Sequence, residues 1–169
     1  AADGVWTNTS SGGWSDSSKW VGGTVAGEGG AATFKAASGT YSVTNDLAAP
    51  VVLSSLSANT DAGNAATWAI VGGTNVMVAP ALVYTRGDSM SVRLSTLSGS
   101  DDITFTGLGR FFLGDDNLLT GRAIISNGNV RVARDSGFGA LPVSYRADAI
   151  ILDGGGIEND DNSFVLTNH

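Results

Sequence analysis

Apolar side chains recur along this chain at short, strand-like intervals. No window of about eleven residues or more places them at helical spacing, and Gly, Ser, Thr, Asn or Asp interrupts the chain every few residues. The runs between these interruptions are rich in β-branched and aromatic residues, which is typical of β-strands. The pattern predicts strands at Tyr41–Thr44, Val51–Leu56, Thr67–Val71, Asn75–Val78, Ala81–Tyr84, Ser91–Leu97, Ile103–Thr106, Arg110–Leu113, Arg122–Ser126, Asn129–Ala133, Asp148–Leu152 and Ser163–Thr167.

About a dozen short strands in one chain of this length fit a β-sandwich or a β-solenoid. Their close spacing favours a solenoid, in which coils of roughly twenty to thirty residues stack on one another. Three segments, Gly72–Asn75, Ser126–Asn129 and Asp153–Gly156, can form its sharp corners, because glycine adopts positive φ without a Cβ penalty. Apolar side chains would then stack in interior ladders that include Val92, Leu94, Ile103, Phe105, Ile124, Val130 and Val132. The sequence therefore predicts an all-β fold, a parallel β-solenoid.

The first 38 residues differ from the rest. Trp6, Trp14 and Trp20 lie among Ser, Asn and Gly, and a short apolar segment ends at Phe34. The open end of a coil stack exposes strand edges and apolar interior, which proteins usually cover. We therefore expect residues 1–38 to form a Trp-rich N-terminal cap and residues 39–169 to form the coils of a single domain.

Composition and charge narrow the function. Hydrophobic residues make up 42% of the 169 residues and charged residues only 15%, which is enough apolar content for a packed core. The formal net charge is −7 and the nine Lys and Arg residues are scattered along the sequence, so nucleic-acid binding is not expected. No run approaches the ~18 apolar residues of a membrane span, and the chain has no cysteine.

Both ends of the sequence also carry expectations. The chain begins Ala1-Ala2-Asp3, which fits the residues left after cleavage of an export signal, so we expect a secreted or cell-surface location. At the other end, the run Phe164, Val165, Leu166 and Thr167 predicts a terminal strand, which would either continue into a longer chain or pair with another molecule.

Three segments resemble a known family. The first segment comprises Gly13–Ser15, Lys19–Gly23 and Ala31–Phe34. The second is Leu113–Ala133, in which an Asn and a Thr-Gly are followed by a strand, an Asn-Gly turn and another strand. The third comprises Asp135–Pro142 and Ala147–Gly155. Together they resemble the β-helical passenger regions of bacterial autotransporters and the related strand-repeat proteins. The resemblance implies a right-handed solenoid and a role at the bacterial surface.

Candidate catalytic chemistry is sparse. The one histidine is His169, the last residue, which disfavours Ser-His-Asp or Cys-His catalysis. The pairs Asp101-Asp102, Asp115-Asp116 and Asp160-Asp161 could supply the carboxylates of a polysaccharide lyase or hydrolase. Adjacent strand residues point to opposite faces and Asp is a common turn residue, so we favour turn and surface aspartates, with no metal and no cofactor.

Two features suggest binding. Arg86-Gly87-Asp88 matches a cell-adhesion tripeptide, although it also fits a tight turn after a strand. The tryptophans could stack on sugar rings, but a capping role for Trp6, Trp14 and Trp20 explains their clustering better.

The leading hypothesis is a non-catalytic, exported structural or adhesive module that assembles with itself, end to end or by strand addition, or continues into a longer chain. The alternatives are a carbohydrate-active enzyme on the same fold and a receptor-binding adhesin acting through Arg86 and Asp88, with polysaccharide or a host-cell surface as partner.

Overall fold

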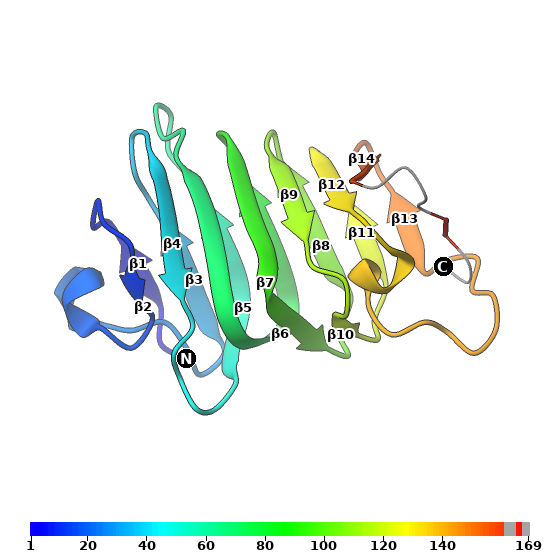
Figure 1. The fold of residues 1–169 in the computed structure, drawn as a ribbon, viewed down its shortest axis with the longest axis horizontal. Coiled ribbons are helices and arrows are strands. Elements are labelled where there is room, and N and C mark those ends of the chain that lie inside the picture. The colour runs from blue at the N-terminus through cyan, green and yellow to red at the C-terminus, as the bar shows by residue number, and fades with distance from the viewer. Residues whose placement is uncertain (161–164, 167–169) are drawn as a thin grey trace.

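The computed structural model describes residues 1–160 and 165–166 and confirms a parallel β-solenoid of about six turns. Strands from successive coils lie side by side along the long axis, with the N-terminal coil at one end and the C-terminal coil at the other (Figure 1). The strands are β1 (Gly4–Trp6), β2 (Gly12–Gly13), β3 (Gly30–Phe34), β4 (Thr40–Thr44), β5 (Val51–Ala58), β6 (Thr67–Thr85), β7 (Ser89–Gly99), β8 (Ile103–Gly107), β9 (Arg110–Leu113), β10 (Leu118–Leu119), β11 (Ala123–Ile125), β12 (Asn129–Val132), β13 (Ile150–Leu152) and β14 (Gly156–Asn159). Three short 3-10 turns complete them: η1 (Ser17–Lys19), η2 (Val21–Gly23) and η3 (Asp135–Phe138).

The strands form three parallel ladders, each of which is one face of the solenoid. Face A consists of β1, β3, β8, β11 and β13 with the C-terminal parts of β5 and β6. Face B consists of β2, β4, β9, β12 and β14 with the N-terminal parts of β6 and β7. Face C consists of the start of β5, the middle of β6, the end of β7, and β10.

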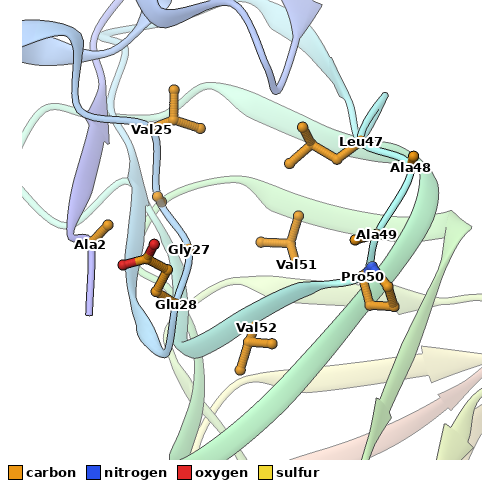
Figure 2. A pocket seen from close by; sticks show the side chains of 11 residues that line it. Ala2, Val25, Gly27, Glu28, Leu47, Ala48, Ala49, Pro50, Val51 and Val52 are labelled. Atoms are coloured by element: carbon orange, nitrogen blue, oxygen red, sulfur yellow. The ribbon is translucent and has the colours of Figure 1, made fainter.

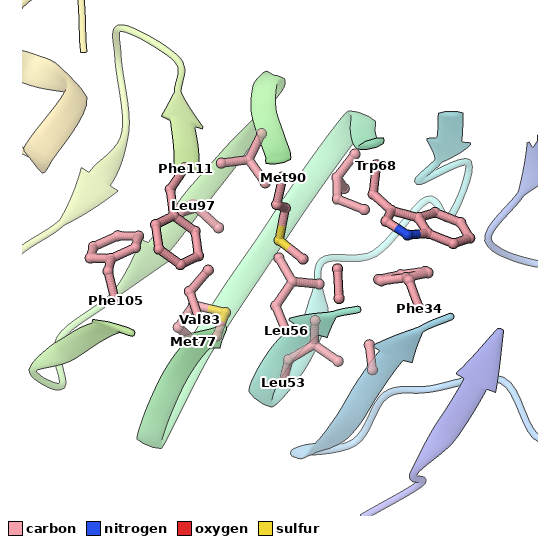
Figure 3. Packing of buried hydrophobic residues seen from close by; sticks show 14 of the residues in the cluster. Phe34, Leu53, Leu56, Trp68, Met77, Val83, Met90, Leu97, Phe105 and Phe111 are labelled. Atoms are coloured by element: carbon pink, nitrogen blue, oxygen red, sulfur yellow. The ribbon is translucent and has the colours of Figure 1, made fainter. Parts of the chain in front are cut away.

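In-register stacking of apolar side chains builds the core. On face A the paired positions run Ala32, Leu56, Val83, Phe105 and Ile125, and on face B they run Tyr41, Trp68, Met90, Phe111 and Val130. All of these except the half-buried Tyr41 are buried, and side chains from the faces meet in one interior cluster (Figure 3). Each coil thus buries its apolar face against the coils before and after it, as solenoid repeats do.

The 19-residue strand β6 replaces three of the predicted strands. Its first section pairs with β4, its middle with the start of β5, and its last with the end of β5 and with β8. Gly72 and Gly73, at φ 72° and 59°, turn the chain between the first two sections. The predicted strand positions were therefore correct, and the breaks between them are corners of one continuous strand.

Other predictions need correction. Strands β1 and β3, which lie within the Trp-rich N-terminal segment, were not predicted, and neither were β2, β10 and β14. Ile124 was expected inside, but Ala123 and Ile125 occupy the inward positions of β11, so strand alternation turns Ile124 outward. Leu94 was also expected inside, yet its side chain is 72% exposed.

A column of polar side chains lies inside the solenoid where faces B and C meet. Asn45 donates through Nδ2 to Asn75 Oδ1 at 3.2 Å, and Asn75 Nδ2 donates to Ser95 Oγ at 2.6 Å. One coil further on, Asn117 accepts the Leu97 amide at 2.9 Å and donates to the Gly137 carbonyl at 2.8 Å. These four buried residues bond the backbone and one another across coils, which avoids the cost of buried unpaired polar groups.

Candidate functional site

The Arg86-Gly87-Asp88 tripeptide forms an exposed corner between β6 and β7. The side chains of Arg86 and Asp88 both reach solvent. However, Asp88 also belongs to the coil packing, because Thr67 Oγ1 donates to its Oδ2 at 2.9 Å and its carbonyl oxygen accepts the Arg110 amide at 3.3 Å. The corner therefore links three successive coils.

Gly87 begins a column of glycines at this corner, a feature that the sequence reasoning missed. The column continues through Gly109, Gly128 and Gly155 in the following coils. A Cβ on Gly109 would lie 2.9 Å from the Asp88 carbonyl oxygen, and one on Gly128 would lie 2.5 Å from the Gly109 carbonyl oxygen. Backbone segments of neighbouring coils approach so closely here that a side chain has no room. The glycine of the tripeptide thus has a packing role of its own.

The adjacent aspartates have separate partners. Asp101 Oδ2 accepts the Ala79 amide at 2.9 Å from the preceding coil, whereas Asp102 accepts Arg122 Nε at 2.9 Å and Nη2 at 2.6 Å from the following coil. Asp115 lies 3.4 Å from Arg134. Within residues 1–160 and 165–166, no group of three His, Cys, Asp or Glu side chains is placed to hold a metal ion. His169 and Asp161 lie outside the described residues.

Asp102 has a lowered pKa, chiefly because the Arg122 side chain hydrogen-bonds its carboxylate and the Arg122 amide adds a second bond. We expect Asp102→Asn to lower the free energy of unfolding by a small amount at neutral pH, since the pair is partly exposed. Because the pKa of Asp102 is lower in the folded state than in the unfolded state, where it is about 4, the ionised carboxylate stabilises the fold at pH values above about 4. This stabilisation is lost as the pH falls through the folded-state pKa. Urea unfolding across pH should therefore show the two proteins differing at neutral pH and converging in acid.

The same variant addresses the enzyme hypothesis. Polysaccharide cleavage that disappears in Asp102→Asn while the neutral-pH stability stays at the wild-type value would contradict a structural role for this carboxylate. Asp116→Asn is the matched comparison for stability, because Asp116 is exposed, and it is a second test for cleavage, because Asp116 belongs to another of the candidate pairs.

Arginines that are far apart in sequence gather on the outer side of face B. The guanidinium carbons of Arg93, Arg110 and Arg131 lie 4.8, 6.0 and 5.6 Å from the centre of the Phe112 ring. Two carboxylates neutralise part of this cluster: Glu158 Oε2 lies 3.0 Å from Arg110 Nε, and Asp160 pairs with both Arg93 and Arg131. These ion pairs tie the end of the last coil to β7, β9 and β12. The arginines are scattered along the sequence, so their positions do not predict that they gather around Phe112.

The N-terminal tryptophans form an aromatic cluster at one end of the core. Trp20 stacks edge-on to Trp6 with ring centres 5.3 Å apart, and it lies 5.2 Å from Trp14 and 5.9 Å from Phe34. Trp14 Nε1 donates to the Ala26 carbonyl at 3.0 Å, and Trp20 Nε1 donates to the Trp14 carbonyl at 2.9 Å. All three indoles are buried, so they cap the core and offer no face to a sugar ring.

The inward positions of β13, in the last described coil, are less buried than those of β11, with which it pairs. Leu152 pairs with Ile125 and occupies an interior position, yet 57% of its side chain is exposed, whereas Ile125 is fully buried. Ile150, also at an inward position, is only partly buried. The predicted strand at 163–167 is not seen where the structure describes it: Val165 and Leu166 have irregular backbone and exposed side chains. Phe164 and Thr167 lie outside the described residues.

An apolar hollow of about 410 Å³ lies beside the first two coils. It is lined by Val25, by Val51 and Val52 at the start of β5, and by Leu47 from the loop before β5 (Figure 2). Residues 25–28 line one side of the hollow and residues 47–50 line the other. The hollow places an apolar surface near the capped end of the molecule.

Comparison of the chain with protein-family models, curated proteins and solved structures finds no match. Inference about function therefore rests on the geometry alone. In that part of the chain that the structure describes, no helix has the length and apolar character to cross a membrane.

Proposed function

We propose that this chain is a non-catalytic structural module, exported to a bacterial surface or extracellular matrix, that extends by end-to-end association of its solenoid. The observation that carries the proposal is the difference between the two ends. The first coil is covered by buried tryptophans, whereas the last described coil leaves Leu152, at an interior position, largely exposed. Exposed interior positions and strand edges favour association with another surface.

The polar chemistry of the solenoid supports a structural role. The carboxylates of Asp101 and Asp102 bond to neighbouring coils, and Glu158 and Asp160 hold the last coil to the arginines of face B. These groups lie along the stack and stabilise it coil by coil.

The two ends are different surfaces, so contact between them is heterologous and repetition gives a filament rather than a closed dimer. Near the N-terminal end, the hollow beside the first two coils contributes an apolar surface lined by Val25, Leu47 and Val51. We propose that the open C-terminal coil of one copy packs against this end of the next.

Sedimentation velocity at increasing concentration, with electron microscopy, tests this association. We expect growing oligomers for the native chain and monomers for Leu152→Asp, because a charge at the apolar end must be desolvated. Leu108→Asp is the matched control, since Leu108 is 73% exposed at a corner away from both ends, and we expect it to assemble normally.

A mixing experiment identifies the ends that meet. Leu47→Asp should also be monomeric, and a mixture of Leu47→Asp with Leu152→Asp should form dimers only, because each protein keeps one intact end. A native chain that stays monomeric at every concentration would contradict end-to-end association, as would equal loss of assembly in Leu108→Asp.

A further inference from the structure

We propose that Asn127 is a self-modification site, at which the folded chain converts asparagine to aspartate and isoaspartate through a cyclic imide. This inference is independent of the proposed function. It rests on the sequence, the exposure and the local contacts of one corner, the turn between β11 and β12.

Asn127 differs in sequence from the other asparagines. It alone is followed by glycine, whereas Asn45, Asn75 and Asn117 precede Asp, Val and Leu. A glycine offers no side chain to hinder approach of its backbone nitrogen to the preceding side chain.

The structure supplies the contact that the reaction needs. The Gly128 amide nitrogen lies 2.9 Å from Asn127 Oδ1, so its hydrogen is directed at the Asn127 side chain and not into the strand ladder, which begins at Asn129. Asn127 is exposed to solvent, and Gly128 has φ +68°. The attacking nitrogen thus contacts the Asn127 side-chain amide group, and solvent reaches that group in the folded protein.

Interior asparagines contrast with this arrangement. Asn75 and Asn117 are buried, with side-chain amides held by hydrogen bonds across coils. Burial excludes the water that hydrolysis needs, and the hydrogen bonds across coils fix each side-chain amide in place.

The chemistry balances without any added oxidant, reductant or cofactor. The Gly128 nitrogen gives up its proton and bonds to Asn127 Cγ, and ammonia leaves, closing a five-membered imide. Water then opens one of the two imide C–N bonds. Opening at the new bond gives aspartate, and opening at the original backbone carbonyl gives isoaspartate, in which the main chain runs through the side-chain carbon.

Both products alter a tightly packed corner. Each adds one negative charge, and isoaspartate also lengthens the backbone by one carbon next to Gly128. The Gly128 carbonyl accepts the Gly156 amide at 3.0 Å, and a Cβ on Gly128 would lie 2.5 Å from the Gly109 carbonyl oxygen. We therefore expect the isoaspartate form to unfold at lower denaturant concentration than the aspartate form.

Peptide mapping by mass spectrometry tests the proposal on the folded 169-residue chain after incubation at two pH values that differ by about one unit. We expect the Asn127 peptide to gain about 1 Da and to appear as two new species. Conversion should be about tenfold faster at the higher value, because the deprotonated amide attacks. Asn127→Gln is the matched control, since its longer side chain cannot close the same ring.

An Asn127→Asp variant separates the effect of charge from that of the lengthened backbone in the stability comparison. The proposal is overturned if Asn127 converts no faster than the exposed Asn129 in the same sample. It is equally overturned if conversion occurs only in urea, because the folded corner would then not be competent.

Discussion

Replacement of Trp68 by alanine is expected to lower the free energy of unfolding by about 3–5 kcal/mol, within the range for truncation of large core aromatics. Trp68 is fully buried on face B, between Tyr41 and Met90 in register. Its ring centre lies 5.3 Å from Phe34 and 5.0 Å from Tyr41, so it joins the N-terminal aromatic cluster to the rest of the core.

The loss should fall at the upper end of that range. Trp68 Nε1 donates to Asn59 Oδ1 at 3.2 Å, and Asn59 is itself fully buried. Truncation therefore leaves a cavity and also an acceptor without its donor, and both cost stability.

Urea unfolding at low protein concentration, followed by circular dichroism, measures the effect without interference from self-association. Tyr145→Ala is the control, because Tyr145 is 70% exposed, and it should change stability by less than about 0.5 kcal/mol. Trp68→Phe should fall between the two. A Trp68→Ala protein within about 1 kcal/mol of wild type would show that this ring does not couple the cap to the core.

Much of the fold follows from local patterns. Strand β9 was predicted at its observed bounds, Arg110–Leu113, because its apolar alternation is clear and turns flank it on both sides. The solenoid itself follows from the density of short strands and glycine-rich corners. Strands such as β14 could not be predicted, because Gly156–Asn159 has little strand propensity and is extended only by pairing with β12.

In the candidate sites, too, local sequence predicts some features, whereas others depend on how the coils pack. Asp101 and Asp102 lie in the turn between β7 and β8, as expected for turn aspartates, and they bond to different coils. By contrast, the grouping of Arg93, Arg110 and Arg131 around Phe112 depends on the lengths of the coils. Those lengths are set by loops whose conformations the strand pattern does not encode.

Gly87 shows why the adhesion tripeptide could not be interpreted from sequence. A turn and a receptor motif need the same residues, and only the packing of the preceding coil separates them. A Cβ on Gly87 would lie 2.9 Å from Ala65 Cα and closer still to the Asn64 carbonyl oxygen. Both neighbours are backbone atoms, which cannot move without shifting the 59–66 loop.

We therefore expect Gly87→Ala to destabilise the fold by about 1–3 kcal/mol through overpacking. Two glycines give matched controls. Gly27→Ala meets no atom within 4 Å and should be close to neutral, while Gly63→Ala is equally open but has φ +86° and isolates the cost of a left-handed backbone. The φ angle of Gly87 lies outside that strained region. The loss of stability in Gly87→Ala therefore reports only the close approach of the neighbouring backbone.

These controls also decide how adhesion must be tested. Loss of cell attachment in Gly87→Ala would not identify a receptor site, since the same change displaces the corner that presents Arg86 and Asp88. Asp88→Glu keeps the charge and the glycine, and its effect on attachment is informative if its unfolding curve matches wild type. Urea unfolding of the glycine variants comes first: a Gly87→Ala protein as stable as Gly27→Ala would remove the packing role and leave surface recognition as the better account of this glycine.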